Sequence, residues 1–144
     1  MTMKASEIMH EPVLATTPEA SALTVATKLV LNRISGMPVT DREGTVLGVV
    51  TEEDILAALM QRESLHTLTV QDIMSKNLAA VSADTPIEII MQTLHDEGIL
   101  RVPVIDDGKL VGIISRADVL RAALHLQQVP TSDRQRAPQK CRQK

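Results

Sequence analysis

Hydrophobic residues follow two kinds of pattern along this chain, and each pattern occurs twice. Apolar side chains spaced three and four residues apart predict one amphipathic helix near residues 22–29 and another near 87–94. After each helix come two short apolar runs, at 37–40 and 46–50 and again at 102–105 and 110–114. The turns between the runs, DREG and DDG, contain the Asp and Gly residues typical of β-hairpins.

Further elements complete the pattern around these hairpins. Short extended pieces are expected at residues 13–16 and 78–81, and helices are expected to begin at Glu52 and Arg116. Thr85 is expected as the N-cap of the 87–94 helix, with Pro86 as its first residue and Glu88 closing a capping box. The second run of each hairpin is almost wholly apolar, so we expect it to be covered on both faces.

The two halves align as an internal repeat. At an offset of 65, Ile34 aligns with Ile99; after one residue is lost in the turn, Thr51 aligns with Ser115. The pattern predicts two β-α-β-β-α units, an α/β (α+β) fold, with boundaries at 1–62 and 63–126. Residues 127–144 are polar and are predicted to form a flexible basic tail.

Composition narrows the classes of function. Hydrophobic residues make up 44% of the 144 residues, but Phe, Trp and Tyr are absent, so the core must be aliphatic. Binding of single-stranded nucleic acid uses aromatic stacking, which this chain cannot supply, and the basic tail gives at most a weak attraction that salt screens. We therefore expect no nucleic-acid partner.

The chain also lacks the marks of export or catalysis. Its single cysteine, Cys141, cannot form an internal disulfide, no apolar run is long enough to span a bilayer, and the N-terminus is too polar for a signal peptide. A cytoplasmic protein without membrane contact is expected. The four histidines show no metal-ligand spacing, and no nucleotide-loop or nucleophile motif occurs. We expect no metal, no required cofactor and no enzyme activity.

The repeated motifs resemble the CBS domain family, specifically a tandem pair of CBS motifs (a Bateman module). The resemblance covers residues 4–126 and is carried by EIM and DIM at 7–9 and 72–74, I-x-x-x-P-V, the turn with Asp, the apolar-Gly-apolar-apolar strand, and Ser/Thr-x-x-Asp. It implies two units packed through their sheets about a pseudo-twofold axis. It also implies a regulatory role, homodimers, an effector protein not specified by the sequence, and a cleft for AMP, ADP, ATP or S-adenosylmethionine.

The resemblance also assigns residues to two related pockets. A base beside Asp118 would be flanked by Val13, Ile34 and Ser35. By symmetry, a base beside Asp54 would be flanked by three other residues, Leu78, Ile99 and Leu100.

The Ser/Thr-x-x-Asp motif itself has two physical interpretations. Ser115 with Asp118, like Thr51 with Asp54, can form a capping box at a helix start. Alternatively, the free amides and the helix dipole can bind a phosphate while the aspartate accepts hydrogen bonds from a ribose. The two interpretations are compatible, because a carboxylate accepts several donors. A crevice filled by its own side chains, with Asp118 turned onto backbone amides, would contradict the second one.

The two pockets differ in charge. The resemblance places a phosphate-contacting basic residue at Arg101, where the first unit has Gly36, and the first motif contains Glu52 and Glu53. We therefore expect the pocket of Arg101, Ser115 and Asp118 to take a phosphorylated ligand. The pocket of Thr51 and Asp54 is expected to be weaker, empty or suited to a nucleoside without phosphates. The alternative function is a ligand-free dimerisation scaffold in which both motifs act only as helix caps.

Overall fold

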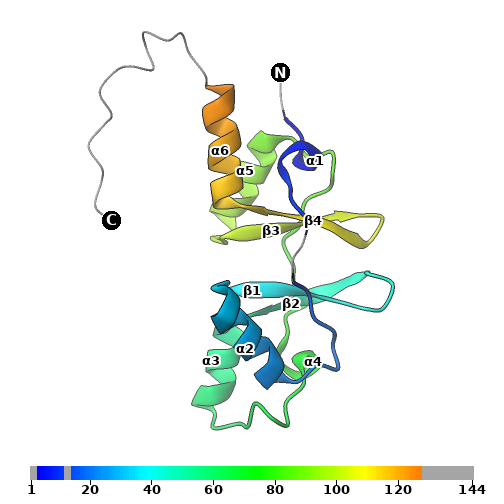
Figure 1. The fold of residues 1–144 in the computed structure, drawn as a ribbon, viewed down its shortest axis with the longest axis vertical. Coiled ribbons are helices and arrows are strands. Elements are labelled where there is room, and N and C mark those ends of the chain that lie inside the picture. Colours follow the sequence, from blue (N-terminus) through cyan, green and yellow to red (C-terminus); the bar gives the residue numbers. More distant parts are fainter. Residues whose placement is uncertain (1–2, 12–13, 128–144) are drawn as a thin grey trace, which may run out of the picture.

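A computed structural model describes residues 3–11 and 14–127. The first half of the described chain contains α1 (Ala5–Ile8), α2 (Ala22–Asn32), β1 (Gly36–Thr40), β2 (Val46–Thr51) and α3 (Glu52–Met60). The second half contains α4 (Val70–Ile73), α5 (Ile87–Asp96), β3 (Arg101–Asp106), β4 (Lys109–Ser115) and α6 (Arg116–Leu126). Figure 1 shows the two sheets next to each other in the middle of the molecule, with the helices on the outer sides.

Each half contains one antiparallel hairpin. β1 pairs with β2 and β3 pairs with β4, each with a register irregularity. The expected extended pieces are present as single parallel bridges, Thr16 to Val39 and Val81 to Val104, rather than as full strands. The hairpin tips link the halves, because Thr45 bridges Lys109 and Lys109 Nζ donates to the carbonyl of Glu43 at 2.9 Å.

The turn between β3 and β4 follows the sequence prediction. Asp106 pairs with Lys109, so the loop consists of Asp107 and Gly108 alone. Both residues have positive φ, 53° and 76°, as a two-residue hairpin turn with the right twist requires. Asp tolerates this conformation and Gly adopts it freely, which explains the dipeptide.

The two short helices each pack on the half opposite to the repeat in which they stand. Ala5 of α1 is fully buried in the core of the second half, beside Ile87 and Ile114. Val70 of α4 is fully buried in the core of the first half. The second structural half is therefore not continuous in sequence, because α1 joins it from the N-terminal end, whereas the first half includes α4 without a break in the chain. The boundary near residue 62 stays a prediction about the repeat alone.

Glycine in the second strand of each hairpin allows a segment of the other repeat to pass close to the sheet. A Cβ at Gly48 would overlap the carbonyl of Ser75, in the segment that follows α4. A Cβ at Gly112 would overlap the side chain of Met9, in the segment that follows α1. The apolar-Gly-apolar-apolar pattern therefore marks the place where the segment that follows α1 or α4 crosses the sheet.

Two expectations need correction, and two helices are additional to those expected. Pro86, not Thr85, is the N-cap of α5, and no side chain caps this helix. Instead, the Ile87 N–H donates to the backbone carbonyl of Met3 at 2.8 Å, so the N-terminal segment supplies the cap. The second strands are buried on one face only, because their other face borders the crevice between the halves. The short helices α1 and α4 were not predicted, because four residues are too few to show a helical period.

Candidate functional site

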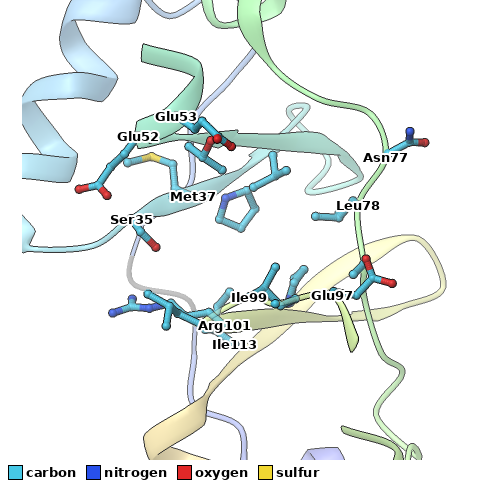
Figure 2. A pocket seen from close by; sticks show the side chains of 18 residues that line it. Ser35, Met37, Glu52, Glu53, Asn77, Leu78, Glu97, Ile99, Arg101 and Ile113 are labelled. Carbon is cyan, nitrogen blue, oxygen red and sulfur yellow. The ribbon is translucent and has the colours of Figure 1, made fainter. Parts of the chain in front are cut away.

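A cavity of about 410 Å³ lies between the two halves (Figure 2). This volume falls in the range of small-molecule sites. Both halves contribute to its walls. The lining residues are Ser35, Gly36, Met37, Pro38, Val49, Thr51, Glu52, Glu53, Asn77, Leu78, Ala79, Glu97, Gly98, Ile99, Leu100, Arg101, Pro103 and Ile113.

This cavity brings together one of the two predicted sets of residues. Thr51 from the end of β2 lies with Leu78, Ile99 and Leu100 from the second half, as predicted for the pocket beside Asp54. Figure 2 shows Leu78 and Ile99 between the two sheets, where an apolar ring could lie against them. Asp54 itself is not among the lining residues, because its carboxylate is turned onto Thr51.

The crevice related by the repeat is smaller. Its volume is about 190 Å³, and Ile34 and Arg101 lie in its wall. Its other lining residues are His10, Leu14, Asn32, Gly36, Pro38 and Ile113. Ser115 and Asp118 are not among them, Ser35 lines the larger cavity instead, and Val13 lies outside the described residues.

Thr51 and Asp54 form a capping box at the start of α3. The Asp54 N–H donates to Thr51 Oγ1 at 3.3 Å, and the Thr51 N–H donates to Asp54 Oδ2 at 2.8 Å. The Thr51 hydroxyl lies 3.1 Å from the same oxygen. All three contacts of the Asp54 side chain and amide involve Thr51, so Thr51 presents the motif to the cavity and Asp54 lies directly behind it.

Ser115 and Asp118 form the same box at the start of α6, with additional partners. Asp118 Oδ2 accepts from the Ser115 N–H at 2.8 Å and lies 3.1 Å from His10 Nε2, while Oδ1 accepts from Arg121 at 3.1 Å. Burial alone would raise the pKa of Asp118, but the hydrogen bonds from Ser115 and Arg121 and the attraction of His10 outweigh it and lower the pKa below its ordinary value. The side chain of Asp118 is only 14% exposed.

The capping interpretation is therefore confirmed at both motifs, and it leaves room for a ligand at one of them. Asp118 is turned onto a backbone amide, as the scaffold alternative requires. The larger crevice, however, is not filled by its own side chains, since it retains about 410 Å³. The roles of Thr51, Asp54, Ser115 and Asp118 as ligand contacts stay predictions.

Charged side chains surround the larger cavity unevenly. Glu52, Glu53 and Glu97 are exposed carboxylates in its lining, and Arg101 is the one cation there. Figure 2 shows Glu52 and Arg101, one from each half, extending toward the same side of the opening. The excess of negative charge disfavours a ligand with several phosphates.

Metal-binding clusters and membrane-spanning helices are both absent from the part of the chain that the structure describes. No three His, Cys, Asp or Glu side chains lie together there as a metal ion would require. No helix there is both long enough and apolar enough to cross a membrane.

His10, Glu97 and Met37 were missed as crevice residues from the sequence. His10 belongs to the segment that crosses to the other half, which no local pattern reveals. Glu97 follows the last turn of α5 in the polar run HDE, and a charge run of this kind is typical of a solvated helix end. The repeat alignment was the available signal, because it pairs Glu97 with Asn32 and His10 with Ser75.

Comparison with known proteins agrees with the internal repeat. The family model described as CBS domain matches residues 5–61 and 70–125. The CBS domain-containing protein CBSX1 of Arabidopsis thaliana is 34% identical over 68% of this chain and 53% of its own length. An L-aspartate semialdehyde sulfurtransferase of Methanocaldococcus jannaschii is 28% identical over 80% of this chain but only 22% of its own length. The chain spans 62% of the length of a relative from Methanopyrus kandleri, so it covers less than two thirds of each of these three relatives.

Two solved structures are similar over most of the chain. The CBS domain pair of protein MJ0100, in complex with 5′-methylthioadenosine and S-adenosyl-L-methionine, superposes with a TM-score of 0.74 at 26% identity, covering 88% of this chain and 99% of that one. CBSX2 in complex with AMP superposes with a TM-score of 0.74 at 30% identity, covering 87% and 98%.

Proposed function

The chain belongs to the CBS domain family, and we propose that it is a regulatory module that binds one adenosine-containing ligand between its halves and transmits the binding to a partner protein. One observation carries the proposal: a cavity of about 410 Å³ is lined by both halves of a duplicated chain. A ligand that contacts both halves favours one relative arrangement of them, and its differential affinity sets the size of the shift. The complexes of two similar CBS pairs with adenosine compounds support the ligand class.

The lining of the cavity suggests how such a ligand would be held. Leu78 and Ile99 offer aliphatic surfaces for a purine, which must substitute for aromatic stacking because the chain has no aromatic residue. Thr51 offers a hydroxyl at the helix start, and Asp54 behind it can accept ribose hydroxyls if its carboxylate rotates outward. The three glutamates favour adenosine, methylthioadenosine or S-adenosylmethionine over ATP.

Thermal unfolding with a panel of these compounds tests the proposal. A ligand at 100 times its Kd adds about 2.7 kcal/mol to the free energy of unfolding, which raises the Tm of a domain of this size by about 8 °C. Ile99→Trp should abolish the shift by filling the cavity, whereas the matched Ile34→Trp in the smaller crevice should preserve it. A panel without any shift would favour the scaffold function.

The outer helices support a homodimer as the assembled form. α2, α3, α5 and α6 lie on the same side of the molecule (Figure 1) and carry large exposed apolar side chains. These include Val30, Leu31, Leu56, Met60, Leu120 and Leu124. Exposed apolar side chains on the outer helices of both halves fit a second copy of the same chain. Met60→Glu should give monomers in sedimentation, while Leu47→Glu, an exposed position on β2, should not.

This dimer is also the assembly that the scaffold alternative requires. The capping geometry of both motifs favours that alternative, because each aspartate already bonds to backbone amides. The Met60→Glu variant separates the two functions, since a cavity within one chain should still bind its ligand in a monomer.

A further inference from the structure

The segments that cross between the halves place different residues at equivalent positions. His10 and Ser75 are 65 residues apart, the repeat offset. The amide and carbonyl of His10 pair with those of Ile113 at 3.1 and 2.9 Å, and those of Ser75 pair with Val49 at 2.9 Å each. The two backbones thus hold the same position against the second strand of a hairpin, and only the side chains differ.

The imidazole of His10 reaches into the smaller crevice. Its Nε2 lies 3.1 Å from Asp118 Oδ2, and its Nδ1 lies 3.3 Å from the carbonyl of Glu11. At this separation the two groups form an ion pair when the imidazole is protonated. With Arg121 on Oδ1 and the Ser115 N–H on Oδ2, both oxygens of this mostly buried carboxylate have partners.

Ser75 makes no such contact in the other half. Its Oγ accepts from the Asn77 N–H at 3.2 Å, within its own segment. Among the described residues no cation pairs with Asp54, and the contacts of the Asp54 carboxylate all use Oδ2. No cation therefore has to be displaced before the Asp54 carboxylate rotates toward a ligand in the larger cavity, whose lining includes Thr51 but not Asp54.

We propose that His10 acts as a built-in occupant of the smaller crevice, so that the chain binds one ribose-containing ligand rather than two. This inference rests on the proposed function, since it assigns the ligand to the larger cavity beside Thr51. A second ligand would have to displace the imidazole from Asp118 before its ribose hydroxyls could reach the carboxylate. The loss of this contact should weaken binding at the second crevice by about tenfold or more.

The asymmetry also reverses the order expected from charge in the sequence. Arg101 lines both crevices, so it does not distinguish them. His10 does, because it lines only the smaller crevice and contacts only the aspartate of that half. His10 thus determines how many sites the duplicated fold offers.

Calorimetric titration with 5′-methylthioadenosine and with AMP tests the role of His10, using variants at the equivalent positions His10 and Ser75. Wild type should bind one equivalent per chain. His10→Ser, which copies the other half, should bind two equivalents. His10→Ala should also bind two, and it controls for a new contact made by the introduced serine. Ser75→His should lose or weaken the single site. Arg121→Ala removes the other side-chain partner of Asp118 without vacating the crevice, so it should stay at one equivalent.

The outcomes separate the inference from the proposed function. Two equal sites in wild type, or one site in both His10 variants, would overturn the role of His10 and leave the proposed function intact. No binding in wild type with one site in His10→Ser would overturn the assignment to the larger cavity and support the role of His10. No binding in any variant would overturn both.

Discussion

At the start of α3, the contacts of the Asp54 carboxylate use one oxygen, whereas at the start of α6 Asp118 uses both of its oxygens. The crevice of the first half has a volume of about 410 Å³, and the related crevice has about 190 Å³. A repeated motif has thus kept its capping box twice while its surroundings diverged. A motif of this kind specifies a helix start, and residues contributed from elsewhere in the chain decide whether a ligand can reach it.

The largest expected effect concerns the glycines under the crossing segments. Gly48→Ala should lower the free energy of unfolding by about 3 kcal/mol, because the new methyl group overlaps the backbone carbonyl of Ser75. Gly112→Ala should cost about 1 kcal/mol, since it meets the flexible side chain of Met9. Chemical denaturation followed by circular dichroism measures both. Equal losses would mean that the two crossings are packed alike.

An intermediate effect is expected from acid. Because the folded pKa of Asp118 is lowered, its ionised form contributes stability above its unfolded pKa of about 3.9, and this contribution is lost as the pH falls through the folded value. Asp118→Asn should therefore flatten the fall in stability between about pH 5 and pH 3. Asp54→Asn is the matched control for the capping contact. A wild-type slope in Asp118→Asn would remove the support for this charge network.

The smallest effect concerns the charge around the larger cavity. Glu52→Gln or Glu53→Gln should strengthen AMP binding by about two- to fivefold, since each removes an exposed charge that repels a phosphate. Binding of uncharged methylthioadenosine should not change. Glu88→Gln, at an exposed position on α5 outside the cavity lining, serves as the control in the same titrations. Weaker AMP binding in the cavity variants would mean that the glutamates contact the ligand directly.

Much of the fold could be predicted from local patterns. The hairpins, their turns and the starts of α3 and α6 follow from alternation, Asp-Gly turns and capping boxes, which act within a few residues. The membership of Leu78, Ile99 and Leu100 in the cavity with Thr51 followed from the resemblance. The tail at 127–144 lies almost wholly outside the described residues and stays a prediction.

The crossing of the short helices could not be predicted from the same signals. α1 and α4 have four residues each. The core partners of α1 lie between Val81 and Ala122, and those of α4 lie in the half that precedes it. The contact between His10 and Asp118 depends on that crossing, so no local pattern indicates that one aspartate is occupied. The ranking of the pockets from Arg101, Glu52 and Glu53 did not take this contact into account, and it stays a prediction.

Methyl NMR with 5′-methylthioadenosine tests the central claim most directly. Ile99 lines the larger cavity and Ile34, its repeat equivalent, lines the smaller one. Saturating ligand should shift the δ-methyl signal of Ile99 strongly and leave that of Ile34 nearly in place. A strong shift of Ile34 with Ile99 unmoved would contradict the assignment, and two unmoved signals would contradict binding between the halves.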